Sequence, residues 1–305
     1  MSNLREISRR IASVQSTMQI TRTMEMVSTA KIRRALERSE AAAPYKDAIK
    51  RILKNVSNAG GDTAQQPLLR THFEEKNVLF ILIASDRGLA GGFNISLQRE
   101  VQAEMDHFRR QGVECQLITC GRKPTDYFTY RGVEPVMSFT GHSSEPTMDD
   151  ADRIASYAMD GYVSGRIDRV VLYYQHARNR VDQDLVMDQI LPLRAEDLTL
   201  PNEPRNPEAV EHVGGKVYST FTFDPSPTEV LGYLIPAYIR TVIFHALLDS
   251  AAAEHGARRR AMQSATDNAQ EVITSLSRTY NRVRQGSITT ELNEIIGGAA
   301  ALEDN

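Results

Sequence analysis

The glycine-rich segment Ser85–Asn94, SDRGLAGGFN, is the part of this sequence best suited to bind a phosphate group. It follows an apolar run and precedes a helical pattern, which is where backbone N–H groups bind phosphate in nucleotide-binding folds. Its glycines, Gly88, Gly91 and Gly92, are spaced G-x-x-G-G, so neither G-x-G-x-x-G nor a loop ending in Gly-Lys-Ser/Thr is present. Two interpretations stay open from the spacing: a phosphate site, or a turn in which glycine supplies a positive φ.

Other residues capable of chemistry form no motif that would make a catalytic or metal site. No G-x-S-x-G nucleophile motif and no paired-carboxylate motif occurs. The two cysteines, Cys115 and Cys120, lie an odd number of positions apart in one expected strand, so we expect them on opposite faces and not in a disulfide. The histidines show no metal-ligand spacing; they are His72, His107, His142, His176, His212, His245 and His255. We therefore predict no catalytic residue and no metal site, while a phosphate site at the glycine turn stays open.

Charge is distributed unevenly along the 305 residues, although the net charge is only −3. Residues 1–54 carry twelve basic and five acidic residues, a charge of +7, which leaves −10 for the remainder. A basic arm is compatible with nucleic acid, with an anionic surface or with a solvated helix face. We favour the solvated face, because no aromatic residue that could stack on bases occurs in the arm before Tyr45.

Membrane-spanning and secretory signals are not expected. The longest apolar run is about eight residues, against the ~20 that a spanning helix needs. The first residues lack the apolar region of a signal peptide, and a helical pattern continues from them to residue 57. We expect a bacterial protein in a reducing, cytoplasmic compartment.

Two helical segments at the ends of the chain carry apolar seams at coiled-coil spacing. The first, residues 3–57, continues through Pro44 and is followed by a linker at 63–75. Its seam consists of Leu4, Ile7, Ile11, Val14 and Met18, with Ile20, Met24 and Val27 continuing a slightly shifted stripe. The second, residues 226–301, has Pro236 at a break or in the first turn, and its seam consists of Met262, Ala265, Ala269, Val272, Leu276, Tyr280 and Val283.

Between these segments, apolar strand patterns alternate with helical patterns, which predicts βαβ units and a mostly parallel sheet. We expect strands at 78–84, 113–120, 133–139 and 169–175, apolar runs at Leu185–Leu191 and Tyr218–Phe223, helices at 93–110, 124–131 and 146–164, and an exposed excursion at 194–216. The expected fold is α/β: a long antiparallel coiled coil of the terminal helices plus a central Rossmann-like domain. The expected boundaries are 1–60, 76–223 and 226–305.

Four stretches resemble the γ subunit of F-type ATP synthases. RRIASVQSTMQITRTMEMVSTAK (Arg9–Lys31) resembles the family's opening helix, and SDRGLAGGFN resembles the turn after the first strand of its central domain. SATDNA (Ser264–Ala269) and RQGSITTELNEIIGGAAAL (Arg284–Leu302) resemble its closing helix. The stretches occur in the family's order, so the resemblance covers essentially the whole chain.

The resemblance implies a rotor and not an active site. In that family the paired helices form a shaft inside a ring of three α and three β subunits, while the foot contacts the ε subunit and the c-ring. Proton flow turns the shaft, which couples ion transport to ATP synthesis or hydrolysis. The implied chain is non-catalytic, binds no nucleic acid, and lies on the cytoplasmic side of the bacterial membrane only through its complex. The glycines Gly88, Gly91 and Gly92 then only shape a turn, and no cofactor is expected.

Individual coupling residues are also implied by the resemblance. Met24 and the run 26–31 match the shaft region that faces the β subunits, and Ile288 and Leu292 are expected as bearing or seam residues. The remaining expected β-subunit contacts are Lys31, Arg258, Arg284, Gln285, Thr289 and Glu291. Because the helices pair antiparallel, we expect Met24 to approach the group 284–291 in space.

Two rival functions remain to be weighed against the rotor. One is a stand-alone α/β enzyme that binds a phosphorylated cofactor or nucleotide at 88–92. The other is a coiled-coil scaffold whose basic arm binds nucleic acid, which requires salt-sensitive binding.

Overall fold

The computed structural model describes residues 2–58, 66–141, 143, 145–179, 182–193 and 226–303. Within the first of these ranges the side chains are described for residues 4–56, and within the last for residues 226–296. The expected excursion at 194–216 and the apolar run Tyr218–Phe223 lie outside the described residues. The chain divides into two compact units: Met1–Thr29 with Arg258–Asn305, and Ala30–Ala257.

Two long helices contribute to both units. α1 spans Ser2–Asn58 and α5 spans Pro227–Glu303, which confirms the expected terminal helices. Pro44 lies inside α1 as expected. The expectation of a break or first turn at Pro236 is wrong, because α5 begins at Pro227 and continues through Pro236. The first-turn position, where a missing N–H costs least, is taken by Pro227 instead.

A five-stranded sheet forms the centre of the larger unit. Its order is β3-β2-β1-β4-β5; β3, β2, β1 and β4 are parallel, and β5 pairs antiparallel with β4, so the mostly parallel α/β sheet is confirmed. The elements are η2 (Pro67–Leu69), β1 (Asn77–Ile83), α2 (Phe93–Arg110), β2 (Glu114–Cys120), α3 (Arg122–Tyr130), β3 (Met137–Phe139), α4 (Met148–Val163), β4 (Arg169–Ala177) and β5 (Gln183–Leu191).

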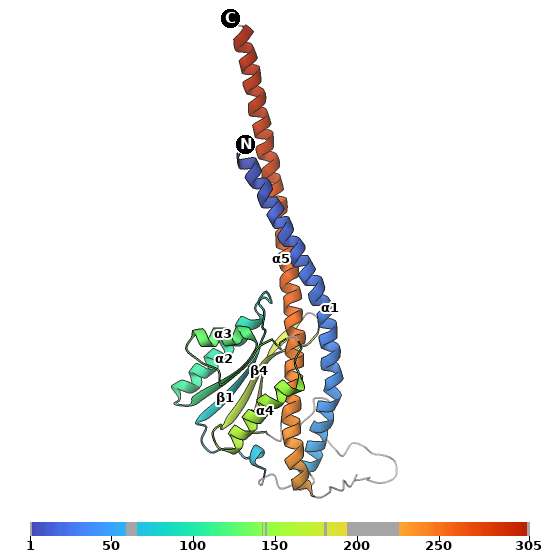
Figure 1. Ribbon diagram of the computed structural model, residues 1–305, viewed down its shortest axis with the longest axis vertical. Coiled ribbons are helices and arrows are strands. Elements are labelled where there is room, and N and C mark those ends of the chain that lie inside the picture. Colours follow the sequence, from blue (N-terminus) through green and yellow to red (C-terminus); the bar gives the residue numbers. More distant parts are fainter. Residues whose placement is uncertain are drawn as a thin grey trace, which may run out of the picture. The chain divides into compact units, whose positions relative to one another are not determined.

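Helices cover both faces of the sheet, so β1 is apolar at almost every position. Leu79, Ile81 and Ile83 face α4 and the early turns of α5, together with part of α1. Phe80 and Leu82 face α2 and α3. Figure 1 shows α2 and α3 on one side of the sheet and α4 on the other.

The cysteines lie as expected on opposite faces of β2. Cys120 belongs to the α4 side and Cys115 packs on the α2 side, and both thiols are free. Cys120 is buried, and its burial raises the pKa of the thiol far above the ordinary value.

α5 contains one stretch that is apolar enough to cross a membrane by length and composition, with a mean hydropathy of 1.5. Core helices of other proteins meet the same criterion, and 44% of this stretch is buried in the protein. Ile235, Ile239 and Ile243, each four positions apart on α5, pack into the core on the α4 side of the sheet. α5 is therefore a core helix of the larger unit.

In the smaller unit, the N-terminal part of α1 pairs antiparallel with the part of α5 from about Arg258 to Val283. Leu4, Ile7, Ile11, Val14 and Met18 are buried or half-buried, as the sequence predicted. The matching positions of α5 step through Met262, Ala265, Ala269, Ile273, Leu276, Tyr280 and Val283.

Three predicted seam positions are wrong. Ile20 and Val27 are 58% and 51% exposed, whereas Thr21 and Ser28 take the inward positions. On α5, Val272 is exposed and its neighbour Ile273 is buried. The heptad therefore continues without a shift, and polar residues interrupt its apolar character on α1. The hydroxyls of Thr21 and Thr266 form a hydrogen bond of 2.8 Å across the seam, which gives them a partner.

Candidate functional site

The glycine turn is closed by its own aspartate, Asp86. One carboxylate oxygen, Oδ1, accepts hydrogen bonds from the backbone N–H groups of Arg122 and Gly141, each at 2.9 Å. The other, Oδ2, accepts from the N–H of Ser143 at 2.9 Å. The donors belong to the segments that follow β2 and β3, so one side chain links the carboxyl ends of three parallel strands.

These hydrogen bonds hold Asp86 in its ionised form. Partial burial raises the pKa of the carboxyl, but the N–H donors of Gly141, Ser143 and Arg122 outweigh it and leave the pKa below the ordinary value. Backbone N–H groups at the ends of parallel strands are the ones a doubly wound fold offers to phosphate. Here an internal anion already occupies them.

Only one of the three predicted turn glycines needs the freedom of glycine. Gly91 has φ 58°, in the left-handed region, and the adjacent Leu89 has φ 62° although it carries a side chain. Gly92 is the residue that caps α2, with φ −80°, and a Cβ there would meet nothing within 4 Å. At Gly88 a Cβ would contact only Cε of Lys123, at 3.7 Å.

The most demanding glycine of this region, Gly121, was not among the predicted site residues. Its φ is 111°, and a Cβ would lie 2.7 Å from the carbonyl oxygen of Ala84 and 2.9 Å from the carbonyl carbon of Ser85. The backbone after β2 thus passes directly against the backbone after β1. In the sequence Gly121 follows an apolar strand, and that single glycine was the available signal.

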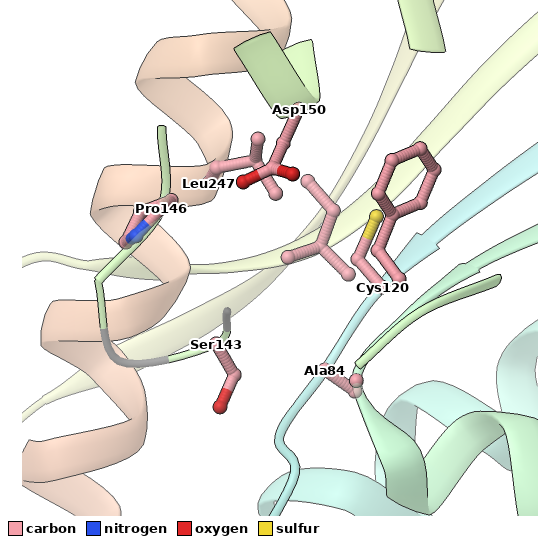
Figure 2. A pocket seen from close by; sticks show the side chains of 9 residues that line it. Ala84, Cys120, Ser143, Pro146, Asp150 and Leu247 are labelled. Carbon is pink, nitrogen blue, oxygen red and sulfur yellow. The ribbon is translucent and has the colours of Figure 1, made fainter. Parts of the chain in front are cut away.

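The cavity at these strand ends is too small for a nucleotide. Ile83, Cys120, Asp150 and Leu247 are among its lining residues, and its volume is about 20 Å³. Figure 2 shows Leu247 of α5, Asp150 of α4 and Cys120 of β2 gathered around it. A single water occupies about that much space, whereas ligand pockets usually measure several hundred Å³.

α5 fills the place where a doubly wound fold would open a crevice. The crevice of such folds lies beyond the carboxyl ends of the strands at which the strand order reverses, here β1 and β4. Ala84 follows β1 and Ala177 ends β4, and both pack in one cluster with Ala252, Ala253 and Ala257 of α5. Small alanine side chains therefore lie on both sides of this contact.

A polar cluster next to this contact ties α5 to β4. Asp249 of α5 is buried; its Oδ2 lies 2.5 Å from Nδ1 of His176, and its Oδ1 accepts the N–H of Ala177 at 3.1 Å. One turn earlier, His245 lies 3.4 Å from Nζ of Lys46 on α1. Burial, and then the charge of Lys46, lower the pKa of His245 to about 4. These contacts are structural, and among the described residues no group of His, Cys, Asp and Glu is placed to hold a metal ion.

The predicted coupling residues fall into two exposure classes. Met24 is half-buried in the pair of the smaller unit, and Arg258 is buried, with 8% of its surface exposed. Lys31 is exposed on the part of α1 that belongs to the larger unit. The group on the last turns of α5 is exposed throughout: Arg284, Gln285, Thr289 and Glu291.

The expectation that Met24 approaches the group 284–291 is wrong. The hydrogen bond between Thr21 and Thr266 fixes the register, so the antiparallel partner of Met24 lies near residue 263. Arg284 is 21 residues further along α5, or about 30 Å at 1.5 Å per residue. The same register places residue 283 opposite Leu4 and residue 285 opposite Ser2, so Thr289 and Glu291 extend beyond the start of α1.

The last described turns of α5 also expose a run of large apolar side chains. Ile288 and Leu292 are 51% and 52% exposed, so within this chain they are not seam residues. Ile295 and Ile296 continue the run. A bearing role for Ile288 and Leu292 stays a prediction.

The chain resembles known proteins over its full length. A family model described as ATP synthase matches residues 3–302. ATP synthase gamma chains of Desulforamulus reducens and Pelotomaculum thermopropionicum are 39% and 41% identical to it over 303 residues, covering 99% of this chain and 100% of each relative.

Solved structures share the fold at lower identity. A chain from the Euglena gracilis mitochondrial ATP synthase, OSCP/F1/c-ring in rotational state 3, aligns with a TM-score of 0.65 and 18% identity, covering 99% of this chain and 95% of that chain. A chain from the central stalk and c-ring of the Tetrahymena thermophila mitochondrial ATP synthase aligns with a TM-score of 0.59 and 22% identity, covering 81% and 99%. Together with the family match and the full-length relatives, these findings show that the chain belongs to the ATP synthase gamma chain family.

Proposed function

We propose that this chain is the central-stalk rotor subunit of a proton-translocating F-type ATP synthase. The observation that carries the proposal is that gamma chains are 39% and 41% identical to this chain over 303 residues. Its partners are then three α and three β subunits, the ε subunit and the c-ring. It associates peripherally with the cytoplasmic side of a bacterial membrane through that complex.

The subunit itself is non-catalytic in this proposal. The N–H groups that could bind phosphate at the strand ends are bonded to Asp86, and the cavity beside them measures about 20 Å³. Both observations count against a phosphorylated cofactor at 88–92. ATP chemistry then belongs to the α and β subunits, and this chain changes their states by contact.

Coupling arises when a partner binds different rotor angles with different free energies. All four residues of the group on α5 are exposed, and Thr289 and Glu291 also extend past the start of α1, so the group is available to a surrounding ring: Arg284, Gln285, Thr289 and Glu291. Met24 acts about 30 Å away on the shaft, at a different level of the ring. Lys31 and Arg258 complete the proposed contact set.

Copurification tests the proposal. A tagged chain expressed in its host should recover α, β and ε subunits in fixed stoichiometry, together with ATP hydrolysis that pumps protons only while the membrane sector is attached. The same chain purified without partners should hydrolyse no ATP. Recovery of a monomeric chain free of α and β, or robust hydrolysis by that free chain, would contradict the rotor assignment.

A further inference from the structure

A basic cavity lies in the larger unit, separate from the strand-end cavity. It measures about 100 Å³ and is bounded by α1, by α5 and by the segment just before α4. Lys31, Arg34 and Arg38 line it from α1. Their spacing of three and four residues places all three on one face of that helix.

Buried residues of α5 form the floor of this cavity. Leu248, Ala251 and His255 line it, and each is at most 5% exposed. The rim is therefore cationic and exposed while the base is dry. Charges that border a low-dielectric surface act on an anion more strongly than charges in open solvent.

The charges of the residues that line the cavity do not cancel. Three cations face one carboxylate, that of Glu145, which leaves a fixed charge of two positive units when the imidazole of His255 is neutral. Among the described residues, none of the three cations forms an ion pair within 4.0 Å. Arg33, on the neighbouring face of α1, is by contrast paired with Glu37 at 2.8 Å.

Volume and charge together select the class of ligand. A cavity of about 100 Å³ has room for about three waters or for one tetrahedral oxyanion, and it is smaller than the several hundred Å³ of nucleotide-sized pockets. Guanidinium groups bind such oxyanions through paired N–H donors, and a lysine adds a point charge. Arg34 and Arg38 are one turn apart, so both can donate to the same anion.

We propose that this cavity binds a free tetrahedral oxyanion of the phosphate class. The bound anion is held by the three cations of α1 above the buried floor on α5. It neutralises three cations that would otherwise repel one another. The site is distinct from the glycine turn, where Asp86 already supplies the anion.

The test measures the melting temperature of the full-length chain by circular dichroism, since the chain has no tryptophan to report by fluorescence. Inorganic phosphate is titrated against chloride at constant ionic strength, and binding raises the melting temperature with phosphate concentration. The variants Arg34→Gln and Arg38→Gln should each weaken the affinity for phosphate about tenfold or more, because each removes a charge-assisted hydrogen bond. Arg33→Gln is the matched control, since it removes the same charge from the same helix outside the cavity.

Either of two results in the phosphate titration would overturn the proposal, and a third could come from ATP. One is a melting temperature that follows ionic strength alone. The other is a loss of the phosphate effect in Arg33→Gln as large as in Arg34→Gln, which would mean diffuse attraction to a basic helix. A parallel titration with ATP at the same ionic strength distinguishes free phosphate from the phosphate groups of a nucleotide. Stabilisation by ATP at lower concentration than by phosphate would refute a site for the free anion.

Discussion

Replacing Asp86 by alanine should destabilise the larger unit without affecting nucleotide chemistry. The carboxylate is the acceptor for three backbone N–H groups, those of Arg122, Gly141 and Ser143, all at 2.9 Å. In the alanine variant these N–H groups have no side-chain acceptor and can bond only to water. Asp86→Asn is the graded comparison, because one amide oxygen can still accept two N–H groups while its NH₂ would face the third donor.

The magnitude follows from the hydrogen bonds lost. A hydrogen bond to a charged acceptor contributes about 1.5–3 kcal/mol when fully buried. Asp86 is only half-buried, so we take about 1 kcal/mol for each bond and expect a loss of roughly 3 kcal/mol for Asp86→Ala. Asp86→Asn should cost about 1–2 kcal/mol, because one bond and the charge are lost.

The pH dependence of this difference has a definite sign. The folded pKa of Asp86 lies below its unfolded value, so its stabilisation is fully present above the unfolded pKa and disappears as pH falls through the folded pKa. The gap in urea midpoint between wild type and Asp86→Ala should therefore be constant near neutrality and shrink in acid.

Hydrogen exchange localises the effect. The amides of Arg122, Gly141 and Ser143 should exchange faster in Asp86→Ala than in wild type, while amides at the antiparallel seam of the smaller unit should not change. Equal midpoints for wild type and Asp86→Ala at pH 7 would refute the reasoning. So would stoichiometric nucleotide bound to the wild-type turn and absent from the variant.

Three further changes test separate parts of the argument. Gly91→Ala should destabilise by about 1–2 kcal/mol because it puts a Cβ at positive φ, whereas Gly92→Ala should stay within about 0.5 kcal/mol; equal losses in urea unfolding would contradict this. Met24→Lys should assemble normally but lower the ratio of protons pumped to ATP hydrolysed in membrane vesicles, because a new charge-assisted bond to a β subunit would deepen one rotor position by about 1.5–3 kcal/mol. Gln19→Lys on the same helix is its control, and an unchanged ratio for Met24→Lys would remove the coupling role. Burial holds the pKa of His245 near 4, so the unfolded state takes up a proton at higher pH than the folded state does. The free energy of unfolding should therefore fall by at most about 1.4 kcal/mol per pH unit as the pH drops from about 6.5 to about 4. His245→Gln should flatten that slope in urea titrations.

The sequence predicted elements well where its pattern is long and local. α2 was expected at 93–110 and spans Phe93–Arg110. The apolar run at Leu185–Leu191 became the antiparallel edge strand β5, whose pairing depends on contacts that no local pattern states. The predicted seam was wrong at Ile20, Val27 and Val272, because these positions were assigned to it from their hydrophobicity alone.

The predictions that failed depend on contacts between residues that are far apart in the chain. Thr21 is inward because Thr266 faces it across the antiparallel pair, and neither residue is apolar enough to be read as a seam position. The separation of Met24 from Arg284 depends on the same register. Asp86 lies within the quoted glycine turn, yet its role depends on Gly141 and Ser143, which are more than fifty residues away in the chain.

The resemblance of the central domain to nucleotide-binding folds has a physical resolution in α5. A doubly wound sheet leaves a crevice where its strand order reverses, and a protein that binds no nucleotide there must fill it. Ala252, Ala253 and Ala257 of α5 fill it, since they pack in one cluster with Ala84 after β1 and Ala177 at the end of β4. Asp249 then bonds the last residue of β4, so the helix is joined to the strand by packing and by hydrogen bonds together. The surface that would hold a ligand in a nucleotide-binding relative thus fixes a long helix to a rigid sheet, and rigid attachment is what an element that transmits force between partners requires.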